Sequence, residues 1–254
     1  MDINQIHQYW DAYIYAQQVT ETDDVECLLA LIGDAPKRVF EVACGGGRIL
    51  APLARAGHDV VGMDLNAEMM ARIPKEAEGR WVSGNVLTDD WGSGYDVVVV
   101  GANFLVNIET ADDYKAAQRM ILRKAADSVH EGGHVFVHVD RVHDPKREGQ
   151  HGYGGDWVIF EGEDDHGVYG KFSMMPGVYD ADTQIDHGKR KIELTLSGGE
   201  RHEQVIERIK HFPSRVQLHE WLADAGLTIE REWGGFDGRP VDEGDGCVVI
   251  WARK

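Results

Sequence analysis

Short, continuously apolar runs alternate with segments of helical periodicity through the first 140 residues of the chain. Strands that are apolar along their whole length and alternate with helices are typical of a parallel sheet covered on both faces. The sequence therefore predicts an α/β fold, in which ligands bind at the carboxyl ends of the strands. The expected strands are Arg38–Ala43, Asp59–Met63, Trp81–Val82, Tyr95–Val100 and Gly133–Val139, and the expected helices between them are Arg48–Ala56, Ala67–Ile73 and Asp112–Val129.

The pattern changes after residue 144, where a polar, glycine-rich loop (143–156) is followed by segments in which apolar and polar residues alternate. This period of two predicts half-buried antiparallel strands. The parallel pattern then resumes, so we expect residues 145–212 to form a small antiparallel lid sheet inserted into a domain of residues 1–144 and 213–254. A separate second domain is the alternative. The expected later elements are strands at Trp157–Phe160, Val168–Met175, Lys191–Leu196 and Gln204–His211, a helix at Pro213–Ala225, and strands at Thr228–Trp233 and Cys247–Ala252.

The charge balance excludes several classes of partner. Lys and Arg number 26 against 44 Asp and Glu, which leaves a formal net charge of −18. A nucleic-acid-binding surface needs the opposite sign. No apolar run approaches the roughly 18 residues of a membrane span, and MDINQIHQYW does not have the pattern of a signal peptide. Cys27, Cys44 and Cys247 are too scattered for a disulfide framework or a zinc site. We expect a cytoplasmic monomer or homodimer that acts on a small molecule, without nucleic acid or membrane partners.

The segment Val39–Gly47, VFEVACGGG, runs from a strand into a glycine-rich turn that precedes a helix. Glycines let the backbone approach a ligand closely, and the first turn of a helix presents unpaired N–H donors. Asp64 ends the next strand, where a carboxylate can accept both hydroxyls of a ribose. This order of elements predicts a nucleoside-containing cofactor. The alternative is a tight turn beside an unrelated surface aspartate.

The residues of this turn restrict which nucleoside-containing cofactor it can bind. A dinucleotide fingerprint would need its third glycine at Leu50, and Glu41 inside the strand suits a cation better than a pyrophosphate. The sequence resembles the class I S-adenosylmethionine-dependent methyltransferases, whose first motif, acid-x-x-x-G-x-G, is filled by Glu41, Gly45 and Gly47. The resemblance covers nearly the whole chain. It implies a Rossmann-like, seven-stranded, mostly parallel sheet with helices on both faces.

The resemblance also implies the cofactor contacts. In that family the glycine loop wraps the methionine part of S-adenosylmethionine, and the residue at Asp64 holds the ribose. The third motif, here SGNV, places Asn85 where the family usually has an aspartate near the adenine amine. The fourth and fifth motifs are YDVVVVGANFLVNI and EGGHVFVHVDR. The implied cofactor-binding residues are Tyr9, Glu41, Ala43, Gly45, Gly47, Asp64, Leu65, Asn85, Val86, Ala102 and Asn103.

The expected lid is similar to those of glycine N-methyltransferases and amino-sugar N-methyltransferases. Arg141 follows the fifth strand, where the glycine-methylating relatives place a substrate-binding arginine; the alternative is an ordinary ion-paired arginine. Tyr9 and Tyr13 lie one helical turn apart, and in the relatives a tyrosine of this helix often faces the methyl group. Together with Tyr153 and Trp157 they predict an aromatic wall for a cationic or planar substrate, and core packing is the alternative.

The chemistry expected is methyl transfer to a small molecule at an amine nitrogen. Tyr13, Asp140 and His143 are the candidate catalytic residues, and the histidine spacing indicates no metal site. Transfer to oxygen or carbon is an open alternative, as is methylation of a macromolecule. Two further alternatives come from other classes of protein: an NAD-dependent oxidoreductase and a non-catalytic regulator that binds a metabolite.

Overall fold

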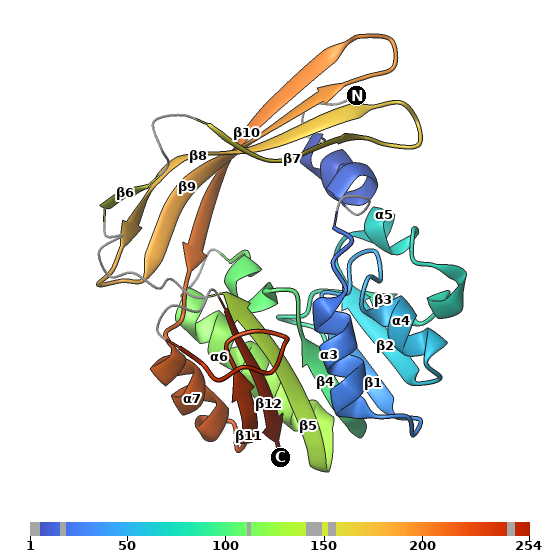
Figure 1. Ribbon diagram of the computed structural model, residues 1–254, viewed down its shortest axis with the longest axis vertical. Coiled ribbons are helices and arrows are strands. Elements are labelled where there is room, and N and C mark those ends of the chain that lie inside the picture. The colour runs from blue at the N-terminus through green and yellow to red at the C-terminus, as the bar shows by residue number, and fades with distance from the viewer. Residues whose placement is uncertain (1–5, 16–18, 111–112, 141–148, 152–155, 243–246) are drawn as a thin grey trace. The chain divides into compact units, whose positions relative to one another are not determined.

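The computed structural model describes residues 6–15, 19–110, 113–140, 149–151, 156–242 and 247–254. The chain divides into two compact units (Figure 1). One consists of Glu21–His143 and Phe212–Lys254, and the other of Met1–Thr20 and Asp144–His211. The predicted larger domain includes residues 1–144, whereas the described N-terminal residues 6–15 group with the smaller unit.

The larger unit is built on a seven-stranded sheet in the order β11-β12-β5-β4-β1-β2-β3. β12 runs antiparallel to β5 and β11, and the remaining neighbours are parallel. The predicted seven-stranded, mostly parallel sheet is therefore confirmed. Its strands are β1 (Arg38–Val42), β2 (Asp59–Asp64), β3 (Trp81–Ser83), β4 (Tyr95–Val100), β5 (Val129–Asp140), β11 (Thr228–Trp233) and β12 (Cys247–Arg253).

Helices cover both faces of this sheet (Figure 1). Because side chains of a strand alternate between the faces, Val97 and Val99 of β4 pack with the helices α3 and α4, while Val98 and Val100 pack with α6 and α7. Two apolar layers result, as the continuously apolar strands predicted. The helices are α3 (Asp23–Ile32), α4 (Leu50–Arg55), α5 (Ala67–Met70), η3 (Lys75–Ala77), η4 (Phe104–Asn107), α6 (Tyr114–Ser128) and α7 (Arg215–Asp224).

The two longest crossover helices begin at side-chain caps. Asp113 accepts hydrogen bonds from the backbone N–H groups of Lys115 and Ala116 at the start of α6. Ser214 and Gln217 form a reciprocal capping box at the start of α7. These caps satisfy donors that a helix leaves unpaired at its first turn and define where each helix starts.

The order of the strands reverses at β1. The chain passes from β1 to β2 on one side and returns to β4 on the other side of β1. In open α/β sheets, ligands bind beyond the carboxyl ends of the strands at such a point. The glycine turn follows β1 and Ala102 follows β4, so both predicted segments lie at this position of the sheet.

The smaller unit contains a five-stranded antiparallel sheet in the order β10-β9-β8-β6, with β7 paired to β8. The four predicted antiparallel strands are all present. β6 lies within the segment expected to be a loop, where Gly149–His151 pairs with β8. The strands are β6 (Gly149–His151), β7 (Trp157–Glu163), β8 (Tyr169–Asp180), β9 (Ile185–Thr195) and β10 (Arg201–His211).

The N-terminal helix packs on this sheet. It consists of α1 (Ile6–Tyr9) and a π-helical segment, η2 (Trp10–Tyr15). The Trp10 ring stacks on Phe172 with 5.7 Å between ring centroids. A Cβ atom on Gly170 would lie 2.3 Å from Ile14 Cδ1, so glycine is required where the helix approaches the strand. Core packing is therefore a role of this aromatic segment.

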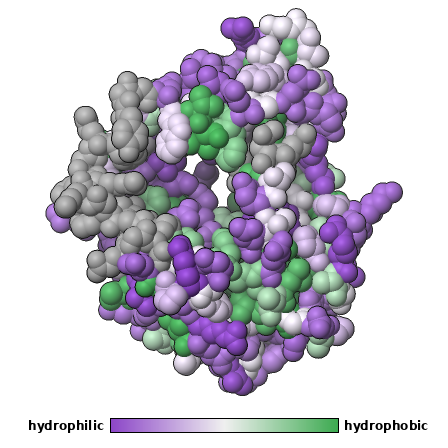
Figure 2. Space-filling view, viewed as in Figure 1, coloured by the Kyte–Doolittle hydropathy of each residue, from purple (hydrophilic) through white to green (hydrophobic). Residues whose placement is uncertain are grey.

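Hydrophilic side chains predominate on the face of the molecule seen in Figure 2, in keeping with the net charge of −18. In the part of the chain that the structure describes, no helix has the length and apolar character needed to cross a bilayer.

Candidate functional site

The turn after β1 uses residues with left-handed backbone. Gly45 and Gly47 have φ values of 51° and 79°, and Ala43 between the strand and the turn has φ 55°. Residues other than glycine rarely adopt these backbone angles. A Cβ on Gly45 or Gly47 would also lie 3.1 Å from the side chain of Met69 or Ile73, respectively. The glycines thus permit both the turn and its close packing.

Asp64 at the end of β2 holds this turn in place. One carboxylate oxygen accepts a hydrogen bond from Gly45 N at 2.8 Å, and the other accepts from Asn66 N at 2.8 Å. A carboxylate offers about four acceptor positions, so these two bonds leave capacity for further donors. Leu65 beside it is 67% exposed and offers an apolar surface at the same strand end. Asp64 can therefore organise the turn and accept hydroxyl groups of a ligand.

Glu41 is the most unusual residue of the site. It is 4% exposed within β1, and its Oε2 atom has no hydrogen-bond partner among the described residues. Burial raises the pKa of this carboxyl well above its usual range; Arg48 opposes that shift, and Asp64 and Asp24 add to it. The backbone N–H of Leu50 hydrogen-bonds to the carboxyl and also opposes the shift, but a buried carboxyl oxygen without a partner is costly to the folded chain. A cationic ligand would supply the missing partner.

Arg48 and Asp24 form an ion pair that the sequence pattern did not predict. The guanidinium of Arg48 donates to both carboxylate oxygens of Asp24, at 2.7 and 2.5 Å. Arg48 is the one cation among the charged groups that act on Glu41, and this fork commits it to Asp24. The surroundings of Glu41 consequently remain acidic, which favours a positively charged ligand.

Asn85 follows β3 and shapes the next turn. Its Oδ1 atom accepts a hydrogen bond from Leu87 N at 2.9 Å, and its backbone N–H donates to Asp89 at 2.9 Å. Val86, which follows it, is buried, and the Val86 carbonyl accepts from the Trp91 indole. The side-chain carbonyl of Asn85 keeps one lone pair for a ligand amine.

The ends of β4 and β5 are joined by Asn103 and Asp140. Asn103 Nδ2 donates to Asp140 Oδ2 at 2.5 Å, and Asp140 N donates to Asn103 Oδ1 at 2.9 Å. The structure thus brings together a residue predicted to bind the cofactor and one predicted to act in catalysis. Ala102 and Asn103 both have left-handed backbone, with φ values of 49° and 56°.

His138 lies on the same strand as Asp140. Its Nε2 atom is 3.7 Å from Asp140 Oδ1, and its ring packs edge-on against Phe236 with 4.8 Å between centroids. Burial lowers the pKa of His138; Asp140 and Asp24 oppose this shift, and Arg48 adds to it. A histidine with a lowered pKa is neutral at pH 7, so this contact is not an ion pair at that pH.

Three predicted residues lie in the smaller unit. Tyr9 and Tyr13 stack with 4.6 Å between ring centroids, as their spacing of one turn suggests. The hydroxyl of Tyr9 donates to Asp164, so a ligand contact by Tyr9 has to use its ring. Trp157 on β7 is 64% exposed. The predicted residues Arg141, His143 and Tyr153 lie outside the described residues.

One group of potential metal ligands is found among the described residues, Asp164, Asp165 and His166. Asp164 already accepts hydrogen bonds from the Tyr9 hydroxyl and from the backbone N–H groups of His166 and Val168. These bonds join the N-terminal helix to the turn between β7 and β8. These hydrogen bonds give Asp164 a structural role that explains why the three side chains lie close together.

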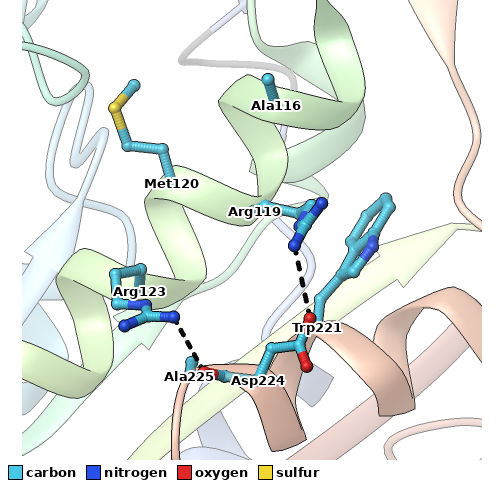
Figure 3. Close-up of a pocket in the computed structure, with 7 residues that line it drawn as sticks. All are labelled: Ala116, Arg119, Met120, Arg123, Trp221, Asp224 and Ala225. Carbon is cyan, nitrogen blue, oxygen red and sulfur yellow. Dashed lines mark hydrogen bonds and ion pairs between the residues drawn. The ribbon is translucent and has the colours of Figure 1, made fainter.

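A surface groove of about 370 Å³ lies between α6 and α7 (Figure 3). Arg119 and Arg123 of α6 reach across it to the carboxylate and the backbone carbonyl of Asp224. Its lining includes Met120 and Trp221 but none of the predicted site residues. The groove is therefore separate from the residues at the carboxyl ends of β1, β2, β4 and β5.

A doubly wound sheet with a glycine turn and acidic residues at its switch point defines an α/β protein that binds a nucleoside cofactor. Comparison with protein families identifies the family of the chain. It belongs to the family described as methyltransferase domain, whose model matches residues 15–232. Comparison with curated proteins gave no significant match.

Solved methyltransferases share the fold. The CcbJ methyltransferase from Streptomyces caelestis is 19% identical over 98% of this chain and 96% of its own, with a TM-score of 0.70. CalS10, a SAM-bound amino pentose methyltransferase from Micromonospora echinaspora, is 18% identical over 94% of each chain (TM-score 0.64). The sugar N-methyltransferase KedS8 from Streptoalloteichus sp ATCC 53650 is 19% identical over 93% of this chain and 88% of its own (TM-score 0.65). At these identities the likeness concerns the fold.

Proposed function

We propose that this chain transfers a methyl group from S-adenosylmethionine to an amine nitrogen of a small molecule. The observation that carries the proposal is the buried Glu41 carboxyl, whose Oε2 atom lacks a partner beside a glycine turn held by Asp64. A cofactor that carries a ribose and cationic groups meets both requirements. A ligand without a cationic or donor group would leave the Oε2 atom of Glu41 without a partner.

Each part of the cofactor has residues that fit it. Ala43, Gly45 and Gly47 form the turn for the methionine part, with Glu41 facing its positive charge. The ribose hydroxyls bind Asp64, and the adenine lies near the residues that follow β2 and β3. When bound, the cofactor supplies an electrophilic methyl group on a positively charged sulfur. The remaining proposed contacts are Leu65, Asn85, Val86, Ala102, Asn103 and the ring of Tyr9.

The acceptor side is proposed from Asp140 and from the names of the relatives. The carboxylate of Asp140 is 49% exposed at the end of β5, where it can bind an ammonium group and take up its proton. Two of the similar structures are named as an amino pentose methyltransferase and a sugar N-methyltransferase. We assign the lid to residues 145–212 and acceptor contacts to Arg141, Tyr153 and Trp157, with Tyr13 and His143 near the transferred methyl.

The chain has to position the acceptor and keep its amine nitrogen unprotonated, so that the lone pair on that nitrogen can attack the methyl group. Alignment of the two reactants can contribute about 7–11 kcal/mol to the rate acceleration. The proposed location is the cytoplasm, and the proposed oligomeric state is a monomer or homodimer.

Calorimetry tests the cofactor. S-adenosylhomocysteine should bind to the purified protein, whereas NAD should not. Binding of NAD alone would instead favour an oxidoreductase.

Mass spectrometry with labelled S-adenosylmethionine tests the acceptor. The protein is incubated with matched panels of amines, alcohols and carbon acids, and transfer to the amines is expected. Methylation confined to alcohols or carbon acids would replace the nitrogen proposal with an oxygen or carbon one. Cofactor binding without transfer to any panel would favour a non-catalytic regulator.

A further inference from the structure

The turn that follows β3 is closed by hydrogen bonds to Asn85. The Asn85 carbonyl accepts from the backbone N–H groups of Thr88 and Asp89, and the Asp89 carboxylate accepts from Asn85 N at 2.9 Å. A Cβ on Gly84 would lie 2.9 Å from that carboxylate, so the chain before the turn also packs closely against it. The proposed adenine contact thus belongs to a compact turn of residues 85–89.

The side-chain amide of Asn85 has a defined orientation within this turn. Its Oδ1 atom accepts a hydrogen bond from Leu87 N at 2.9 Å. Rotation of the amide by half a turn would bring Nδ2, which is a donor, against that N–H donor. The carbonyl end of the amide is therefore fixed. Its second lone pair can accept a hydrogen bond from a ligand amino group, whereas a ligand carbonyl at the same position would be repelled.

Lys124 of α6 holds the same turn. Its Nζ atom donates to the carbonyls of Val86 and Asp89, at 2.6 and 2.7 Å. The ammonium also lies over the Trp91 ring, 4.8 Å from the centroid, and the Trp91 indole donates to Val86 O at 3.0 Å. One side chain therefore attaches the second and the last residue of the turn to a helix of 15 residues.

Lys124 is partly withdrawn from water to make these contacts. Burial lowers the pKa of its ammonium, and Asp89 and Asp90 oppose that shift. A lysine that only covers apolar surface keeps its ammonium in water, because its long side chain lets the charged end extend outward. Hydrogen bonds from an ammonium to a carbonyl are charge-assisted, so loss of Lys124 removes the strongest bonds between α6 and the turn.

We infer that Lys124 is a positioning residue, which holds the turn of residues 85–89 so that Asn85 selects a cofactor whose purine carries an amino group. The inference rests on the proposed cofactor and on the proposed adenine contact of Asn85. Lys124 acts through the turn rather than on the ligand. A purine that has an oxygen in place of the amino group should therefore bind more weakly, and Lys124 should determine by how much.

Calorimetric titration with two nucleosides measures this selectivity. S-inosylhomocysteine differs from S-adenosylhomocysteine in its base, which carries an oxygen and a ring N–H where adenine has an amino group and a bare ring nitrogen. The wild-type protein should bind S-adenosylhomocysteine about tenfold more tightly, since inosine leaves the Asn85 carbonyl without its ligand partner.

The first variant is Lys124→Met, which removes the ammonium and keeps an unbranched apolar side chain. The turn should then loosen, so that the Asn85 amide can rotate and donate to the inosine oxygen. We expect the Kd of S-adenosylhomocysteine to rise about fivefold and the ratio of the two Kd values to fall to about 2. Lys115→Met, near the start of the same helix, is the matched control and should change both quantities by less than about twofold.

The second test is a double-mutant cycle. Asn85→Ala removes the selecting amide and should bring the two Kd values close together. If Lys124 acts through Asn85, then Lys124→Met in the Asn85→Ala background should raise the Kd of S-adenosylhomocysteine by less than about twofold. The same rise in both backgrounds would show that Lys124 acts by a separate route and would overturn the inference.

The other outcomes separate the inference from the function on which it rests. If the wild-type protein binds neither nucleoside, the proposed function fails, and the inference fails with it. If it binds S-inosylhomocysteine no more weakly than S-adenosylhomocysteine, the inference alone fails. An unchanged ratio of Kd values in Lys124→Met, with or without weaker binding, would make Lys124 a structural residue only. Equal effects of Lys115→Met would also overturn the inference.

Discussion

At the scale of single residues, Glu41 is the side chain whose environment differs most from what its chemistry requires. Its strand neighbours Phe40 and Val42 are buried apolar residues, and its carboxyl is almost fully buried with them. The nearby cation, Arg48, is engaged by Asp24. The structure therefore maintains an acid whose charged form is unfavourable until a cationic partner binds.

Glu41→Gln should stabilise the cofactor-free protein. The folded-state pKa of Glu41 is raised, so the folded chain loses stability as the pH rises above about 4.3, the ordinary pKa of glutamate. Glutamine does not ionise and avoids this loss. If about 1 kcal/mol is recovered at pH 8, the Tm should rise by about 2–4 °C, with a smaller difference at pH 5. Calorimetric melting at both pH values checks this, and an unchanged or lower Tm at pH 8 would contradict it.

The affinity for S-adenosylmethionine should rise with pH through the titration of Glu41. A cationic ligand favours the ionised carboxyl, so binding releases a proton when Glu41 is protonated in the free protein. Titrations in buffers of different ionisation enthalpy measure this release. Glu41→Gln should abolish the release and weaken binding about tenfold. Equal affinity and equal proton release in both proteins would remove Glu41 from the cofactor site.

At the scale of elements, the N-terminal helix and the antiparallel sheet depend on each other. Trp10 and Ile14 are almost fully buried, and they pack over Gly170 of β8. Tyr9 adds a hydrogen bond to Asp164, which lies 155 residues later in the chain. A short helix of this kind is stabilised by tertiary contacts rather than by its own propensity.

Gly170→Ala should displace this helix. The added Cβ would lie 2.3 Å from Ile14 and 2.8 Å from the Trp10 ring, so one of the two has to move. Overpacking of this type costs about 1–3 kcal/mol. Denaturant unfolding should show the loss, and limited proteolysis should cut within residues 6–15 faster. Gly198→Ala is the matched control, because a Cβ there meets nothing within 4 Å; equal effects of both changes would contradict the packing argument.

The elements show which parts of the molecule local sequence can predict. The strands of the parallel sheet were predicted because their apolar runs follow from burial on both faces. The predicted strand began at Lys191, whereas β9 begins at Ile185. The earlier residues were not predicted because Asp186 and Gly188 are poor strand formers. Pairing with β8 and β10 nevertheless holds them in an extended conformation.

The candidate site shows the same limit. Glu41, Asp64 and Asn85 could be chosen as candidates because each follows or lies within a recognisable strand. The pairing of Arg48 with Asp24 and of Asn103 with Asp140 has no local signal, since these contacts join residues 24 and 37 positions apart. Buried polar pairs of this kind are decided by tertiary packing.

At the scale of the whole molecule, the net charge of −18 acts as a general repulsion. Salt screens repulsion between exposed charges, with a Debye length of about 10 Å at 0.1 M. The Tm should therefore rise by a few degrees between 20 and 300 mM NaCl. The KM for an amine acceptor should stay nearly constant if the acidic excess serves solubility, and it should increase if that excess attracts the acceptor. A Tm that falls with salt would show that ion pairs outweigh the repulsion.

The partnership of the N-terminal helix with a distant sheet has a consequence during synthesis. The 155 residues between Tyr9 and Asp164 take roughly 8 to 30 s to translate at about 5–20 residues per second. Over that interval Ile6, Trp10 and Ile14, which are buried in the finished protein, have no strand to cover them. This segment thus leaves the ribosome long before its native partner does, and in the nascent chain it is a hydrophobic sequence that a chaperone can bind.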